Sequence, residues 1–198
     1  MISVIIPYKE DRGHLWLCKK SIWEQTYQDF ELIEAHGPGT LPENFNEGLR
    51  RAKGEFIKMV QDDDWLPADA LNFLLFGIGD APWVVGHVRQ IPEKGQPWIH
   101  KPPYLDFESQ VKRYDMHMGS TMYRKDVLEE IGGMDETLTT GEEYDMHLKL
   151  LQKGFKPAYT NRVVYNYRMW QGGKSVIYRR ERTKWRKNEL AKIKARYV

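Results

Sequence analysis

The chain has 198 residues, of which 41% are hydrophobic and 29% are charged, and its formal net charge is +2. These proportions exclude a disordered or fibrous protein and fit one globular domain with a substantial core. No apolar stretch approaches the roughly 18 residues that span a bilayer, and a single cysteine, Cys18, excludes an internal disulfide. We therefore predict a cytoplasmic protein of one domain, with Cys18 in its core.

Short apolar runs alternate with segments of helical length in the first part of the chain. Residues 3–6 predict a first strand that ends at Pro7, and residues 13–25 predict a helix. Residues 30–33 predict a second strand. The glycines and the proline of residues 37–39 break the chain after it.

A third apolar run ends in three consecutive aspartates. Residues 46–53 predict a helix that ends at Gly54, which we interpret as a left-handed cap. Residues 56–60 predict a strand, and residues 62–64 are all aspartate. Carboxylates this close repel one another unless protons or a cation neutralise them, and hard oxygen ligands suit Mg2+ or Mn2+. A solvated acidic turn is the alternative interpretation.

The alternation of strands and helices predicts an α/β fold, with a mostly parallel central sheet flanked by helices. In open sheets of this class, ligands bind beyond the carboxyl ends of the strands. The loops after Ile6, Ile33 and Val60 are therefore expected to meet at one crevice, with the aspartates inside it.

A second acidic cluster consists of Glu142, Glu143 and Asp145, and it opens an apolar pattern of helical spacing that ends near Gly154. Acidic side chains at a helix start often only stabilise the helix dipole. A carboxylate that faces a crevice can instead act as a general base. The residues alone leave both roles open.

The end of the chain carries an excess of positive charge. Residues 174–198 hold ten Lys or Arg against two Glu. A basic segment of this kind binds nucleic acid, an anionic membrane face or a nucleotide diphosphate, or it is only a solvated helix face. Leu190, Ile193 and Tyr197 recur at helical spacing and predict a basic C-terminal helix that packs on the body of the protein or on a partner.

Several short motifs follow one another along the chain. The first group is Ser-Val-Ile-Ile-Pro-Tyr (3–8), Ser-Ile-Trp-Glu-Gln-Thr-Tyr-Gln-Asp-Phe-Glu-Leu-Ile (21–33), Asn-Glu-Gly (46–48) and the aspartate run. The second group is Gly-Ser (119–120), Ile-Gly-Gly-Met-Asp-Glu (131–136) and Gly-Glu-Glu-Tyr-Asp (141–145). In this order they resemble the nucleotide-sugar glycosyltransferases of the GT-A fold, family two. The resemblance covers about residues 2–170.

This resemblance implies a single GT-A, Rossmann-like domain over residues 1–198. It places a nucleotide-sugar-binding half at about 1–90, an acceptor-binding half at about 91–170, and a flexible loop with the basic helical tail at about 171–198. It also implies an inverting, metal-dependent glycosyltransferase of polysaccharide biosynthesis. Such an enzyme moves a hexose-type sugar from a nucleoside diphosphate, with UDP as our first choice, to an acceptor hydroxyl on a glycan or glycoconjugate.

The resemblance further implies a divalent cation, Mn2+ or Mg2+, that stabilises the charge of the departing diphosphate. We assign direct metal contact to Asp64, and contact with the ribose or with metal-bound water to Asp62. The register is open by one residue, because Gln61 stands where the family can have its first aspartate. Asp63 is therefore the alternative ligand.

The catalytic base of the family falls on the second acidic cluster. Glu143 occupies the position where the family usually has Asp, and the extra methylene keeps the chemistry possible. Glu142 and Asp145 are the alternative bases. The base would take the proton of the acceptor hydroxyl as it attacks from the face opposite the leaving group, which inverts the anomeric centre.

The nucleotide pocket departs most from the family, which usually has an aspartate after the second strand. Here Glu34 or His36 is expected to bind the base, and the glycines after Trp170 permit a loop whose cations, Arg179 among them, cover the diphosphate. Trp65 and Trp170 are expected near the ligand. The full set of expected donor-binding residues is Pro7, Tyr8, Glu10, Glu34, His36, Asn46, Asp62, Asp63, Arg168 and Lys174.

Other classes of protein fit parts of the sequence. A catalytically silent carbohydrate- or nucleotide-binding module would tolerate the loss of one acidic site, and both are present. A sugar nucleotidyltransferase would carry a Gly-rich basic loop near the amino terminus, and residues 7–12 do not resemble one. A nucleic-acid-binding protein would rely on the basic tail. We expect no nucleic-acid partner, and we assign the tail to contact with a membrane surface or a partner domain.

Overall fold

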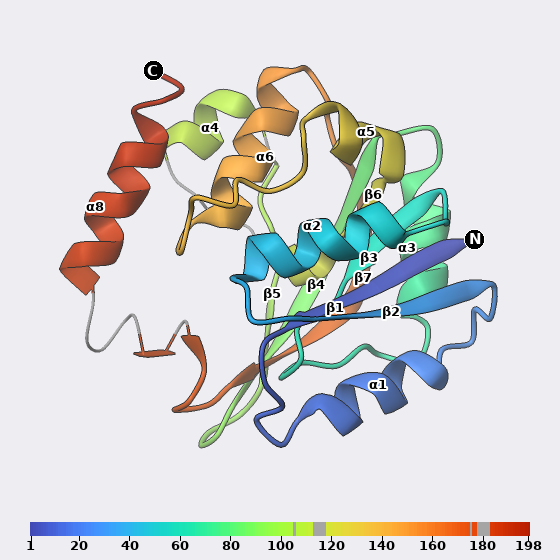
Figure 1. The fold of residues 1–198 in the computed structure, drawn as a ribbon. Helices are drawn as coiled ribbons and strands as arrows, with labels where there is room; N and C mark the ends of the chain where they lie inside the picture. The colour runs from blue at the N-terminus through green and yellow to red at the C-terminus, as the bar shows by residue number, and fades with distance from the viewer. Residues whose placement is uncertain (105, 113–117, 175, 178–182) are drawn as a thin grey trace.

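The computed structural model describes residues 1–104, 106–112, 118–174, 176–177 and 183–198. Figure 1 shows a central sheet with helices on both of its faces. The elements in chain order are β1 (Ile2–Tyr8), α1 (Leu15–Trp23), β2 (Phe30–His36), α2 (Leu41–Arg51), β3 (Phe56–Met59), α3 (Ala70–Ile78), β4 (Trp83–Pro92), β5 (Trp98–His100), α4 (Phe107–Lys112), the 3-10 turn η1 (Met118–Ser120), β6 (Thr121–Arg124), α5 (Lys125–Glu130), α6 (Glu142–Gln152), β7 (Ala158–Met169) and α8 (Thr183–Lys194).

Within the described residues the sheet has seven strands, in the order β2-β1-β3-β6-β4-β5, with β7 also paired to β4. The pairs β1–β2, β1–β3 and β4–β7 are parallel. The pairs β3–β6, β4–β6 and β4–β5 are antiparallel. The predicted α/β class is confirmed, but the sheet is mixed where the sequence predicts a mostly parallel one, because β5 and β6 run against their neighbours.

The core forms two apolar layers, one on each face of the sheet. Along β1, Ile5 faces the layer under α2, α5 and α6, whereas Val4 and Ile6 face the layer under α1 and α3. This alternation is the period of two that a strand buried on both faces requires. Cys18 lies fully buried in the second layer, as predicted.

The helix before β3 begins earlier than the sequence pattern predicts. It starts at Leu41 because Thr40 and Glu43 form a capping box, in which each side chain bonds the backbone of the other. The interpretation of Gly54 as a left-handed cap is wrong, since its φ is not positive. Gly54 is needed for another reason, because a Cβ there would lie 2.7 Å from the backbone nitrogen of Ser3.

The basic C-terminal helix forms as predicted and packs on the body of the protein. Ile193 of α8 is buried against Tyr144 and Leu148 of α6, with Leu190 and Tyr197 beside it. Helix α8 lies close to the start of α6, because a Cβ on Gly141 would lie 2.6 Å from the side chain of Ile193. Among the described helices, none has both the length and the apolar character to cross a bilayer.

Candidate active site

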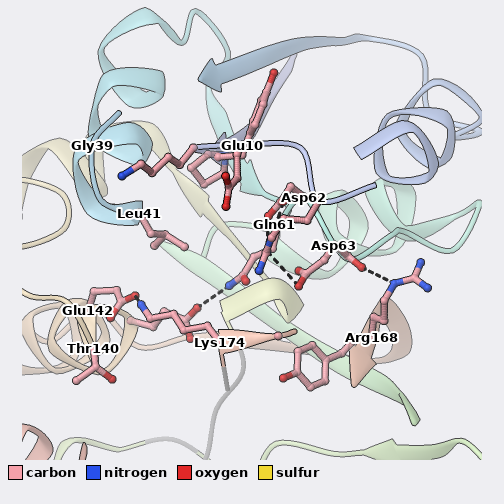
Figure 2. A pocket seen from close by; sticks show the side chains of 18 of the residues that line it. Glu10, Gly39, Leu41, Gln61, Asp62, Asp63, Thr140, Glu142, Arg168 and Lys174 are labelled. Atoms are coloured by element: carbon pink, nitrogen blue, oxygen red, sulfur yellow. Dashed lines mark hydrogen bonds and ion pairs between the residues drawn. The ribbon is translucent and has the colours of Figure 1, made fainter. Parts of the chain in front are cut away.

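A pocket of about 300 Å³ opens where β1 and β3 end and α6 begins (Figure 2). The predicted convergence of the loops after the first three strands is therefore confirmed, because Gly39 after β2 also lines the pocket. Among the predicted residues, nine line this pocket, and they come from four separate stretches of the chain: Pro7, Tyr8, Glu10, Asp62, Asp63, Glu142, Glu143, Arg168 and Lys174.

Asp62 and Asp63 present their carboxylates to the pocket. Burial raises the pKa of Asp62, whereas the nearby guanidinium of Arg12 lowers it. Arg12 Nη2 lies 3.2 Å from Asp62 Oδ1 and 3.3 Å from Asp63 Oδ2. The indole Nε1 of Trp170 donates a hydrogen bond of 2.9 Å to the same Asp63 oxygen. Arg12 and Trp170 therefore hold the two carboxylates in place at the pocket wall.

Asp64 lies behind this wall and does not line the pocket. It is 1% exposed, and it accepts hydrogen bonds from the Tyr165 hydroxyl at 2.8 Å and from the backbone N–H of Arg168 at 2.7 Å. Burial, followed by the charge of Asp63, raises its pKa well above the usual range. Both carboxylate oxygens of Asp64 are thus used to fix β7 against the end of β3.

The three acids at the start of α6 take three different positions. Glu143 reaches Gln61, whose Nε2 donates to Glu143 Oε1 at 3.2 Å, so this acid lies next to the aspartate run. Glu142 is 5% exposed and forms an ion pair of 2.7 Å with Lys174. Figure 2 shows this pair across the pocket from Asp62 and Asp63.

Asp145 turns away from the pocket toward α8. Its carboxylate is fully buried and accepts a hydrogen bond of 2.8 Å from the Tyr197 hydroxyl. Lys149 lies 3.0 Å from Asp145 and Arg196 lies 3.4 Å from it. Asp145 therefore anchors the C-terminal segment to α6.

Of the residues expected around the nucleobase, Pro7, Tyr8 and Glu10 line the pocket, whereas Glu34 and His36 do not. The His36 ring stacks on Tyr8 with centroids 4.8 Å apart, and its Nε2 lies 3.1 Å from the carbonyl oxygen of Lys9. Glu34 accepts a hydrogen bond of 2.7 Å from Lys19, the largest influence lowering its pKa, and one of 3.0 Å from the Tyr8 hydroxyl. Glu34 and His36 thus support the Tyr8 ring from behind.

Asn46 also lies outside the pocket. Its Nδ2 donates to the carbonyl of Met134 at 2.9 Å, and its Oδ1 accepts from the N–H of Met134 at 3.0 Å. The same Nδ2 donates to Glu136 at 2.9 Å. Asn46 therefore joins α2 to the segment before α6.

Several pocket residues escape the sequence analysis. Lys9 and Arg12 follow β1 directly, so the rule that ligands bind beyond strand ends could have identified them. Thr140 precedes α6, and Arg186 of α8 reaches the pocket from the basic tail without a distinguishing motif. Arg179, expected in the cationic cover, lies outside the described residues.

The two tryptophans expected near the ligand differ in position. Trp170 holds Asp63 at the pocket wall, whereas Trp65 stacks under the guanidinium of Arg168, whose Cζ lies 4.9 Å from the ring centroid. Arg168 Nε also donates to the backbone oxygen of Asp63 at 2.8 Å. Trp65 thus acts on the pocket through Arg168.

The fit of a divalent cation rests on two carboxylates. Within the part of the chain that the structure describes, no group of three or more His, Cys, Asp or Glu residues is arranged to hold a metal. Asp62 and Asp63 offer hard oxygen donors at the pocket wall. Mg2+ commonly takes one or two protein carboxylates together with substrate phosphates. The donor set therefore fits a divalent cation whose remaining ligands would come from a bound phosphate group or from water.

The arrangement of these elements is similar to that of S. aureus TarS. The structure of TarS 1-349 in complex with UDP-GlcNAc matches with a TM-score of 0.68 and 15% sequence identity, over 87% of this chain and 59% of that chain. The complex with UDP matches with a TM-score of 0.64 and 14% identity, over 86% and 61%.

A further TarS structure matches with a TM-score of 0.64 and 16% identity, over 86% of this chain. The chain spans 37% of that structure and about three fifths of the two complexes. No protein-family model matches the sequence, and no curated protein matches it. At this level of identity, the likeness establishes the fold.

Proposed function

We propose that the protein is an inverting GT-A glycosyltransferase of family two, which moves a sugar from a UDP-sugar to an acceptor hydroxyl on a glycan or glycoconjugate. The observation that carries this proposal is the position of Glu143 beside the Asp62–Asp63 pair in one pocket. The TarS structures with UDP-GlcNAc and UDP support a UDP-sugar as donor. The tail contact with a membrane or partner domain and the cytoplasmic location remain predictions.

The donor side of the pocket suits a diphosphate. Its lining includes the cationic side chains of Lys9, Arg12, Arg168, Lys174 and Arg186. Guanidinium groups bind phosphate oxygens through paired hydrogen bonds, and ammonium groups bind them as point charges. These side chains would hold the diphosphate against the carboxylates.

A divalent cation, Mn2+ or Mg2+, would be held by Asp63 and Asp62 on this side. It would supply charge stabilisation to the leaving diphosphate. Asp64 would act indirectly, because its two oxygens bind Tyr165 and the backbone of β7. This placement favours the register in which Asp63 is the main ligand.

The acceptor side provides the base. Glu143 would accept the proton of the attacking hydroxyl, and the amide of Gln61 orients its carboxylate. Glu142 is less suited because Lys174 already neutralises it, and Asp145 has no access to the pocket. Attack of the deprotonated hydroxyl on the face of the sugar opposite the leaving diphosphate would invert the anomeric centre.

A nucleotide-release assay tests the proposal. Purified protein is incubated with UDP-, GDP- and dTDP-sugars, with and without Mn2+, and the released nucleotide is measured. We expect release from a UDP-sugar only with the cation. Glu143→Gln should lower turnover by about 100-fold or more, as loss of a general base does, without weakening UDP binding.

Glu47→Gln is the matched control, because the Glu47 side chain is exposed on α2 and pairs with Arg50. This variant should keep full turnover. Normal transfer by the Glu143→Gln variant would reject the assignment of the base. Equal release with added Mn2+ and with EDTA in place of Mn2+ would reject the metal dependence.

A further inference from the structure

The guanidinium of Arg12 lies against the carboxylates of Asp62 and Asp63 in the pocket. Its Nη2 lies 3.2 and 3.4 Å from the two oxygens of Asp62, and 3.3 Å from Asp63 Oδ2. One guanidinium nitrogen therefore contacts three carboxylate oxygens. These oxygens belong to the two residues that the proposed function assigns to the metal and the diphosphate.

The loop that carries Arg12 is held by hydrogen bonds to the Asp11 carboxylate. The carboxylate of Asp11 accepts hydrogen bonds from the backbone N–H groups of Gly13 at 2.8 Å and Leu15 at 3.3 Å, which ties the loop to the start of α1. Gly13 has a φ of +88°, a conformation that other residues rarely adopt. The backbone thus directs the side chain of Arg12 toward the aspartates.

The segment after β7 completes the arrangement. Trp170 lies beneath the guanidinium, with Cζ of Arg12 5.4 Å from the ring centroid, and its indole donates to Asp63 Oδ2 at 2.9 Å. Arg12 Nη1 donates to the carbonyl of Gly172 at 3.4 Å. Arg12 therefore contacts the acids and the loop that would cover a bound diphosphate.

We propose that Arg12 is an internal counter-ion of the Asp62–Asp63 pair, which a divalent cation must displace and which then turns to the nucleotide diphosphate. This inference rests on the proposed function. The side chain of Arg12 is about one third exposed, so it has room to turn, whereas the two aspartates are about nine tenths buried and fixed.

At each stage of this exchange, a positive charge would lie beside the carboxylates of Asp62 and Asp63. Without ligand, the guanidinium offsets part of the repulsion between the two carboxylates. A metal ion alone has to compete with Arg12 for the same oxygens, which weakens its binding. When a nucleotide enters, its diphosphate gives Arg12 a new partner, so the metal and the nucleotide bind together more tightly than either binds alone.

Electron paramagnetic resonance of Mn2+ tests this directly, because free and bound Mn2+ give distinct signals. The wild-type protein and the variants Arg12→Ala, Arg12→Lys and Arg50→Ala are titrated with Mn2+, with and without UDP. Without UDP, we expect Arg12→Ala to bind Mn2+ roughly tenfold more tightly than wild type, the scale of one lost charged competitor. Arg12→Lys should lie between them, because it keeps the charge and loses the fork.

Arg50→Ala is the matched control, since Arg50 forms its ion pairs on α2 with Glu47 and Glu136. It should bind Mn2+ as wild type does. With UDP present, the advantage of Arg12→Ala should disappear, because Arg12 no longer competes. Thermal unfolding of each variant establishes that it is folded.

The outcomes separate the two proposals. If Mn2+ binds with UDP but Arg12→Ala and wild type have equal affinity without UDP, the counter-ion role is wrong and the metal site stands. If no variant binds Mn2+ even with UDP, the metal dependence fails and the counter-ion role fails with it.

Discussion

Replacing His147 with Phe should alter how the stability of the protein depends on pH. His147 lies one turn after Glu143 on α6 and is fully buried. Its ring stacks on Trp83 with centroids 5.3 Å apart, and its Nε2 lies 2.6 Å from the Tyr123 hydroxyl. Its Nδ1 has no hydrogen-bond partner among the described residues. The site thus suits a neutral ring.

The magnitude follows from the pKa. Burial lowers the pKa of His147 from 6.5 to about 3. Below pH 6.5 the unfolded chain therefore takes up a proton that the folded protein does not, and stability falls as the pH decreases toward 3. At about 1.4 kcal/mol per pH unit, this histidine removes about 3 kcal/mol of stability between pH 7 and pH 4. Phe cannot bind a proton and avoids this loss.

Urea unfolding, followed by tryptophan fluorescence at pH 7, 6, 5 and 4, measures the difference. At pH 7 we expect His147→Phe to be less stable than wild type by about 1 kcal/mol, because the bond to Tyr123 is lost. At pH 4 the variant should be the more stable protein. Tyr123→Phe is the control, since it removes the bond but leaves a buried histidine, and its pH dependence should match wild type. Equal pH dependence in wild type and His147→Phe would refute the reasoning.

Three further substitutions test the support of the site. Gly119→Ala should lower the free energy of unfolding by about 1–3 kcal/mol, because the added Cβ would lie 2.3 Å from the fixed ring of Tyr165; an unchanged melting temperature would contradict this. Lys174→Ala should raise the KM for the UDP-sugar more than it lowers kcat, because it removes a pocket cation while releasing Glu142; steady-state kinetics decide. Ile193→Ala should release α8, so that limited proteolysis cleaves the C-terminal segment faster than in wild type; equal cleavage rates would show that other contacts hold the helix.

The sequence predicted the parts of the site that depend on local order. Each strand end near the pocket follows from an apolar run, and the convergence of the loops after the first and third strands follows from the rule for open sheets. The antiparallel strands were missed because β5 and β6 have only three and four residues, too few for a clear pattern.

The sequence could not assign the acids within each cluster. Asp62, Asp63 and Asp64 are identical in type, and only the fold shows that Tyr165, 101 residues away, turns Asp64 inward. Helix geometry does separate Glu143 from Asp145, because two residues are about 160° apart around the axis. The contact of Arg12 with residues 50 positions later depends on tertiary structure alone.

The bond pattern of Asn46 has a consequence for motion. Its side chain both donates to and accepts from the backbone of Met134, as one strand does with another, and a Cβ on Gly133 would lie 2.5 Å from its oxygen. Helix α2 and the segment before α6 are thereby held together at this point. Any opening and closing around a substrate would then occur in the short segments that line the pocket, while the contact between Asn46 and Met134 stays fixed.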